Sequence, residues 1–138
     1  MATRNKSMHN RLLLAGSVML FSVQAAADNF TQADLDRWQV EYLSVVEQGD
    51  RLFHGGLNSK NTVSCDQCHP NAANTHPETY PKFQKQIGSV ATLRDMINWC
   101  IENPLEGEPM DLGDPKMIAL EAYITWERRG VPLDPGKH

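Results

Sequence analysis

Apolar residues recur at helical spacing in three stretches of the chain, and no stretch alternates strongly enough to predict a strand. The first helix is predicted to begin near Thr31, where Asp34 follows at the spacing of a capping box. Gly55 and Gly56 end its pattern. Gly49 lies inside the pattern, where it either admits a closely crossing helix or ends the helix early. The apolar positions of this stretch are Leu35, Trp38, Tyr42, Val45, Val46, Leu52 and Phe53.

The second predicted helix begins near Thr92, which again has an acidic residue, Asp95, three positions later. Pro104 ends this helix, because proline disfavours the helical conformation in the residue before it. Its apolar face repeats at spacings of three and four and consists of Leu93, Met96, Ile97 and Cys100.

The third predicted helix has Asp114 as its N-cap and Pro115 in its first turn, where proline's missing amide hydrogen costs nothing. Gly130 and Pro132 end it. Its apolar residues are Met117, Ile118, Leu120, Ala122, Ile124 and Trp126. The chain is therefore predicted to be all-α, with three main helices.

Residues 1–27 have the layout of a cleavable secretory signal peptide: a basic start, an apolar run over residues 12–23, and alanines at 25–27. A retained membrane anchor is the alternative, but the apolar run is shorter than the roughly 20 residues of a spanning helix. We expect cleavage after Ala27, export to the periplasm, no stable membrane span afterwards, and one mature domain over residues 28–138.

The predicted mature domain is acidic. Residues 1–27 hold three of the 13 basic residues and none of the 17 acidic ones, so ten basic and 17 acidic residues remain, a net charge of −7. This charge argues against nucleic acid and anionic lipid as partners. It permits docking to a basic patch on a redox partner, such as another cytochrome or an oxidoreductase.

The run Cys-Asp-Gln-Cys-His at residues 65–69 matches the C-x-x-C-H pattern of covalent haem attachment. Cys65 and Cys68 would bind the two vinyl groups of one haem c, and His69 would be the proximal iron ligand. A zinc site would need a second ligand pair, which the chain lacks. A thioredoxin-like pair expects a βαβ context, and a structural disulfide leaves His69 unexplained.

The residue that binds iron opposite His69 stays open at this point. Met110 lies in the loop before the last helix, and Cys100, the third cysteine, would bind as a thiolate and lower the potential. Met96 and Trp99 are expected to line the haem pocket together with Met110. Among the remaining candidates, Met117 is expected to pack in the core, and His54 and His76 are expected to be solvent-facing loop residues.

The sequence resembles class I cytochrome c over nearly all of the predicted mature chain. The similar features are residues 49–53, the C-x-x-C-H motif and a last helix that contains Leu-Glu-Ala-Tyr at residues 120–123. In that family the first and last helices cross at a glycine and an aromatic contact. The resemblance assigns this crossing to Gly49, Phe53 and Tyr123, and it implies a small domain around one covalently bound haem.

Residues 97–109 are similar to a narrower group, the haem domains of thiosulfate dehydrogenase and of SoxA-type cytochromes of the sulfur-oxidising Sox system. In both families a cysteine at the position of Cys100 is the distal iron ligand, so the resemblance implies His69/Cys100 ligation, with Met110 as the alternative. The chain departs from those families in three ways. It has no arginine shortly after Cys100, it has one haem motif, and it carries acidic residues that would repel an anion, namely Glu102, Glu106 and Glu108.

We therefore expect a periplasmic monohaem cytochrome that transfers one electron at a time in the oxidation of sulfur compounds. The alternatives are a catalytic haem subunit that oxidises thiosulfate, alone or with a second haem-protein subunit, and a redox or gas sensor in which Cys100 and Met110 exchange on the iron. A catalytic role predicts a cation near the distal face of the haem, from a residue such as Arg94 or from a partner chain.

Overall fold

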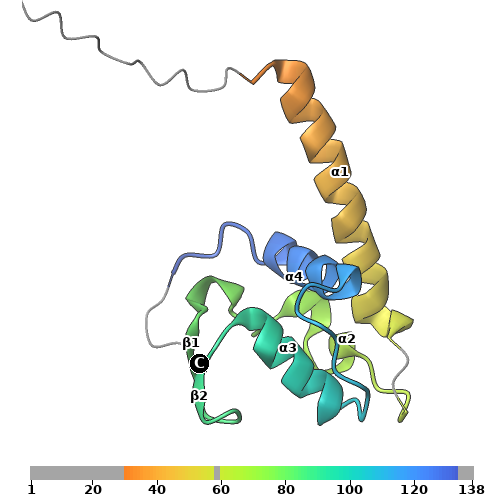
Figure 1. The fold of residues 1–138 in the computed structure, drawn as a ribbon, viewed down its shortest axis with the longest axis vertical. Helices are drawn as coiled ribbons and strands as arrows, with labels where there is room; N and C mark the ends of the chain where they lie inside the picture. Colours follow the sequence, from red (N-terminus) through yellow and green to blue (C-terminus); the bar gives the residue numbers. More distant parts are fainter. Residues whose placement is uncertain (1–29, 58–59, 134–138) are drawn as a thin grey trace, which may run out of the picture.

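Four helices and one short hairpin make up most of the structure (Figure 1). The computed structural model describes residues 30–57 and 60–133, so the predicted signal peptide lies outside the described residues. The elements in chain order are α1 (Gln32–Arg51), η1 (Leu52–Gly56), α2 (Cys65–Cys68), η2 (Pro70–Ala72), η3 (Pro77–Thr79), β1 (Lys82–Gln84), β2 (Ser89–Ala91), α3 (Leu93–Glu102) and α4 (Pro115–Glu127).

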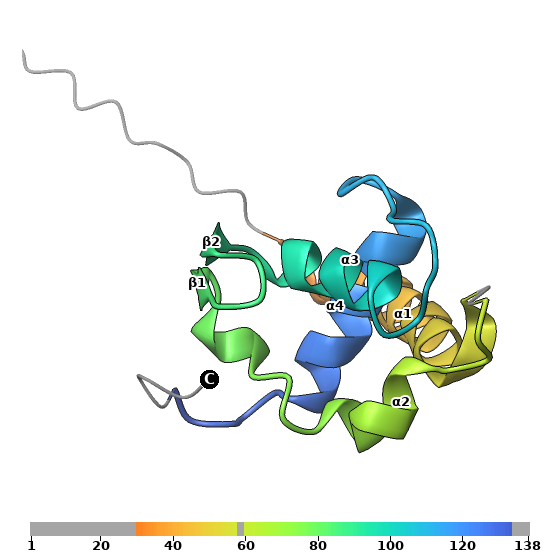
Figure 2. The ribbon, with the colours of Figure 1, turned by 90° about the horizontal axis from the view of Figure 1, so that it is seen from below.

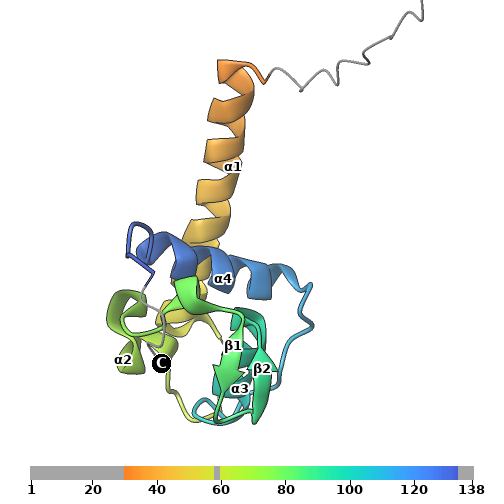
Figure 3. The same ribbon diagram turned by 90° about the vertical axis from the view of Figure 1, so that its left-hand side faces the viewer.

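None of the helices in residues 30–57 and 60–133 combines the length and the apolar character that a membrane span requires. The longest of them, α1, has 20 residues, but charged and amide side chains occupy much of its surface. Its N-terminal half projects away from the other elements, and its C-terminal half crosses α4 (Figures 1 and 3).

The crossing of α1 and α4 brings two backbones almost into contact. Helix α1 starts at the predicted capping box, in which Thr31 and Asp34 bond reciprocally. Gly49 lies within the helix and is buried. A Cβ added there would overlap the carbonyl oxygen of Ala119 and lie 2.7 Å from the Cβ of Tyr123. The close-crossing interpretation of Gly49 is therefore confirmed, and the interpretation as a helix end is wrong.

Aromatic packing extends this crossing into the core. The rings of Phe53 and Tyr123 have centroids 5.1 Å apart, as the resemblance to class I cytochrome c implies. Phe53, Met117 and Leu120 are the largest side chains that are fully buried. The core thus forms where the end of α1 meets the middle of α4, and α3 packs against it through Leu93, Ile97 and Ile101.

Helices α3 and α4 begin at the predicted caps and are joined by an ion pair. Thr92 and Asp95 form the capping box of α3, and Asp114 caps α4 by accepting from the Lys116 amide. Arg94 donates from Nε and Nη2 to one carboxylate oxygen of Glu121, at 2.8 and 2.6 Å. This forked contact fixes the start of α3 against the middle of α4.

The expectation of no strand was wrong. Strands β1 and β2 pair antiparallel, with Lys82 opposite Ala91 and Phe83 opposite Val90. Each strand has only three residues, which is too short for a period of two to stand out in a sequence window. The hairpin lies next to α3 and leaves the mainly helical fold class unchanged (Figure 2).

The prediction that His76 faces the solvent was also wrong. His54 is exposed as expected, but His76 is buried, with 6% of its surface accessible. Its Nδ1 lies 3.2 Å from a carboxylate oxygen of Glu78, so Nδ1 donates a proton in this contact. A buried imidazole needs such a partner, which the polar composition of the loop did not reveal.

We predict that Gly49→Ala lowers the free energy of unfolding by about 1–3 kcal/mol or more. The added methyl group overlaps the α4 backbone and forces the two helices apart. Urea denaturation followed by circular dichroism measures the change. Gln48→Ala is the matched control, since Gln48 is exposed one position away in the same helix. Equal stability of Gly49→Ala and wild type would mean that the crossing is not close-packed.

Candidate functional site

The C-x-x-C-H residues form a single helical turn. Helix α2 spans Cys65–Cys68, and the His69 amide donates to the Cys65 carbonyl oxygen at 2.9 Å. Residues three and four apart lie on one face of a helix, so this turn presents both thiols and the His69 side chain on the same side. All three cysteines are free thiols, and all three side chains of the motif line one cavity.

The His69 ring is oriented by a backbone contact. Its Nδ1 lies 2.9 Å from the Ala73 carbonyl oxygen, just beyond η2. A carbonyl can only accept, so Nδ1 carries a proton, and in the neutral ring Nε2 then keeps its lone pair. This is the tautomer that a metal-ligating imidazole requires, and such a contact fixes both the ring and its basicity.

The cavity has a volume of about 350 Å³, within the ~300–1,000 Å³ range of cofactor clefts. Helix α2 supplies one wall and α3 supplies another, with Met96, Trp99 and Cys100 among the α3 lining residues. Figure 3 shows α2 on one side, α3 with the hairpin on the other, and α4 above both. The apolar lining comes mainly from Phe53, Leu93, Ile97, Leu120 and Ile124.

Burial in this cavity keeps the thiols of Cys65 and Cys100 neutral. It raises the pKa of Cys65 to about 12, and the nearby charge of a Cys100 thiolate adds to the shift. It also raises the pKa of Cys100 to about 11, with a smaller contribution from Cys68. Cys100 on its own is therefore a thiol at neutral pH. A cation bound to its sulfur would reverse this preference, because a metal-ligating cysteine is deprotonated.

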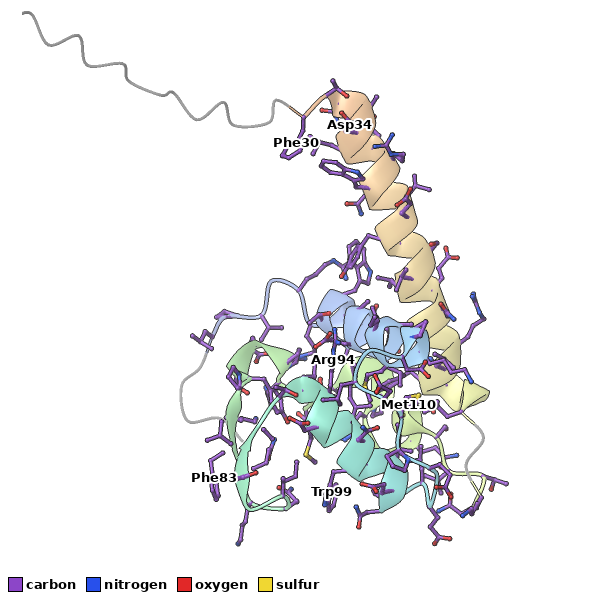
Figure 4. All side chains as sticks on the ribbon, viewed as in Figure 1. Phe30, Asp34, Phe83, Arg94, Trp99 and Met110 are labelled. Atoms are coloured by element: carbon purple, nitrogen blue, oxygen red, sulfur yellow. The ribbon has the colours of Figure 1, made fainter. Side chains whose placement is uncertain are left out.

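Met110 is not part of this cavity. It lines a separate cavity of about 240 Å³ together with Leu57, Ile101 and Leu105. The Asn98 side chain holds its backbone there, because Asn98 accepts from the Met110 amide at 2.9 Å and donates to the Met110 carbonyl at 2.8 Å. Figure 4 shows Trp99 and Met110 on different sides of α3. The expectation that Met110 lines the same pocket as Met96 and Trp99 is corrected, since the Asn98 contact directs its loop elsewhere.

Arg94 is likewise absent from the cavity lining. Its guanidinium binds Glu121 and also donates to the Leu112 carbonyl oxygen at 2.6 Å, between α3 and α4. The cation that lines the cavity together with Cys100 is Lys82 of β1, which the sequence did not reveal. Its signal in the sequence is a polar residue at every second position from residue 80 to residue 86.

The donor set fits a haem better than a bare metal ion. In the described part of the chain, no cluster of three or more His, Cys, Asp or Glu side chains is arranged to hold a metal ion. The cavity instead offers two thiols and one imidazole on one wall and one thiol on another, around an apolar interior. An iron that arrives with its own macrocyclic nitrogens needs only the two axial ligands from the protein.

Comparison with known proteins also points to a haem-binding domain. Residues 48–133, more than half of the chain, match the family model described as "SoxA/TsdA, cytochrome c domain". The chain is 30% identical over 84 residues to a thiosulfate dehydrogenase of Psychrobacter arcticus, covering 55% of this chain and 26% of that protein. It is 31% identical over 85 residues to a thiosulfate dehydrogenase of Allochromatium vinosum, covering 53% and 32%.

The chain thus spans between a quarter and a third of the length of these relatives. Among solved structures, the crystal structure of SoxXA from P. pantotrophus is similar in fold, with a TM-score of 0.62 and 19% identity. The similarity covers 74% of this chain and 40% of that one. At this identity the likeness concerns the fold alone.

We predict that Asn98→Ala lowers the free energy of unfolding by about 1–3 kcal/mol and speeds hydrogen exchange at the Met110 amide, because both contacts to the loop are lost. The control is Asn103→Ala, which removes one exposed bond to the Trp99 carbonyl in the same helix and should cost less. Unchanged exchange at Met110 in Asn98→Ala would mean that the loop is held by other contacts.

Proposed function

This chain belongs to the SoxA/TsdA cytochrome c domain family, and we propose that it is a periplasmic monohaem cytochrome that transfers single electrons in the oxidation of sulfur compounds. Its cofactor is haem c, bound covalently. The observation that carries the proposal is the shared cavity, in which the C-x-x-C-H turn on one wall meets Cys100 from another.

Four residues that line the cavity have individual roles in this proposal. Cys65 and Cys68 hold the cofactor by thioether bonds, His69 is the proximal iron ligand and Cys100 is the distal one. The bound haem supplies a centre that gains or loses one electron. The thiolate charge of Cys100 favours the oxidised state and so lowers the potential, while the apolar lining limits the access of water.

The pathway is proposed from the relatives, whose printed name is thiosulfate dehydrogenase. Because the chain spans only part of their length, catalysis by the whole relative does not transfer to it. A single-electron role needs only a redox centre and a docking surface. The end of α3 and the loop after it offer such a surface, since they carry four exposed carboxylates that suit a basic patch on another cytochrome, an oxidoreductase or a haem-protein subunit: Glu102, Glu106, Glu108 and Asp111.

The sensor alternative has less support. An exchange between Cys100 and Met110 would need the Met110 loop to leave its own cavity and break both contacts with Asn98. The two side chains line different cavities, so no small rotation of one side chain replaces the other.

We predict that the haem-loaded protein shows a low-spin ferric signal of a thiolate ligand, which is lost in Cys100→Ala and kept in Met110→Ala. Electron paramagnetic resonance and ferric optical spectra measure this. The haem should stay covalently attached in both variants, because Cys65 and Cys68 are untouched, and denaturing gel electrophoresis with a haem stain provides this control.

The opposite pattern would refute the assignment of the ligand. A methionine–iron charge-transfer band that disappears only in Met110→Ala would mean that the Met110 loop moves into the cavity on loading. Cys100 would then be a packed thiol, and the proposed low potential would be wrong.

We further predict that the protein isolated from the periplasm of an expressing bacterium begins at Asp28, because cleavage after Ala27 removes residues 1–27. Intact mass and N-terminal sequencing measure the start of the chain. Ala27→Pro is a processing-defective control. Recovery of the complete chain in the membrane fraction would instead identify residues 1–27 as a retained anchor.

A further inference from the structure

An apolar stripe runs along α1 and changes from buried to exposed halfway along the helix. Val46 and Gly49, in the C-terminal half, are buried where the helix crosses α4. At spacings of three and four, the same stripe continues toward the N-terminus through Tyr42, Trp38 and Leu35. These three side chains are 40%, 40% and 46% exposed. The stripe therefore extends beyond the surface that α4 covers.

Phe30 continues the exposed stripe to the free end of α1. Its ring packs edge-on against the ring of Trp38, with the centroids 4.8 Å apart, and it is 59% exposed. Figure 4 shows Phe30 at the end of α1 that projects away from the other elements. Phe30, Leu35, Trp38 and Tyr42 are together called the α1 stripe below.

The α1 stripe lies outside the part of the chain that matches its family. The match covers residues 48–133, so it begins at the crossing of α1 with α4. The half of α1 before the crossing is short, and isolated helices of fewer than about 12–15 residues are marginal in water. Contiguous exposed apolar side chains on such a segment mark an interaction surface.

The charges of this segment argue against a membrane or a nucleic acid as the partner. Residues 30–47 hold four acidic residues and one basic residue, Arg37. A helix that lies on a membrane surface is typically rich in lysine and arginine on its polar face, and nucleic acids repel acidic surfaces. The α1 stripe therefore suits a protein surface.

The α1 stripe is complementary to itself when two copies of the helix run antiparallel. A two-fold axis makes each copy use the same patch, so a residue on one side of the axis meets a residue on the other side. The register that sets Leu35 opposite Tyr42 of the second copy places the two Trp38 side chains next to the axis. Each copy then covers the other's exposed aromatic rings.

The charged residues of α1 suit the same register. It sets Arg37, beside the stripe, opposite Glu41 of the second copy, so an ion pair flanks the apolar contact on each side of the axis. Arg37 binds Asp34 of its own helix at 3.1 Å, and its guanidinium has further donors for the second carboxylate. By the helical spacing, Asp36 and Glu47 lie on the opposite face, where they do not oppose the pairing.

The exposed area is sufficient for a dimer. At their exposed fractions, the three aromatic rings and the leucine present roughly 300–400 Å² of apolar surface in each copy. Because interfaces are about 56–65% apolar, two copies would bury roughly 1,000–1,400 Å² in total. This area reaches the ~1,000 Å² of a biological interface and lies at the lower end of the range, where association depends on concentration.

We propose that the protein forms a two-fold symmetric dimer in which the α1 stripes of two copies pack antiparallel. Helix α4 lies beyond the C-terminal end of the stripe, so the two haem domains would lie at opposite ends of the helix pair. A chain with one C-x-x-C-H motif thereby gains two haem sites in one assembly. The inference depends neither on the distal iron ligand nor on the proposed electron transfer.

Sedimentation velocity of the haem-loaded protein tests the dimer over concentrations from about 1 to 100 μM. Wild type is compared with Trp38→Asp and with Val40→Asp. Val40 is 68% exposed and lies on the opposite face of α1, so its substitution controls for the added charge and the lost apolar side chain. We expect wild type and Val40→Asp to approach twice the monomer mass, and Trp38→Asp to associate at least about tenfold more weakly. Circular dichroism checks that both variants keep the helix content of wild type.

A charge exchange tests the antiparallel register. Arg37→Glu and Glu41→Arg should each weaken the dimer, because each sets like charges opposite one another across the axis. An equimolar mixture of the two variants should recover the association, since the opposed residues then carry opposite charges. Contacts within each helix are the same in the mixture as in the single variants, so the recovery reports pairing between copies.

Three results would overturn the proposal. The first is a wild type that stays monomeric over the whole concentration range, which would leave the α1 stripe to a different protein. The second is a dimer that Trp38→Asp and Val40→Asp weaken equally or not at all. The third is a mixture of Arg37→Glu and Glu41→Arg that associates no better than either variant alone, which would refute the antiparallel pairing.

Discussion

The close approach of Gly49 to the backbone of Ala119 is the constraint on which the rest of the structure depends. It sets the distance between α1 and α4, and that distance lets Phe53 reach Tyr123 and close the core. Phe53 also lines the cavity, as do Leu120 and Ile124 of α4. A wider crossing would therefore move the inner wall of the site as well as weaken the core.

The cavity suits a redox cofactor because its two buried thiols carry no charge until the cofactor is bound. Burial raises the pKa of Cys65 and of Cys100, so both thiols are neutral beforehand. With the ligands proposed above, thioether formation would remove the acidity of Cys65 and Cys68 altogether, and iron would make the thiolate of Cys100 favourable. The same low polarity that penalises an unpaired thiolate strengthens its attraction to a bound metal.

Local chemistry made the helices and the haem motif predictable from the sequence. Capping boxes at Thr31 and Thr92 act over three residues, and the C-x-x-C-H pattern fits within one turn, so both are visible without the fold. What the sequence did not reveal depends on distant partners. The burial of His76 depends on the packing of its loop, and the position of Met110 depends on Asn98, 12 residues earlier. The hairpin was missed because each strand has only three residues and because polar residues of its first strand line an apolar cavity, which a search for buried apolar residues does not recognise.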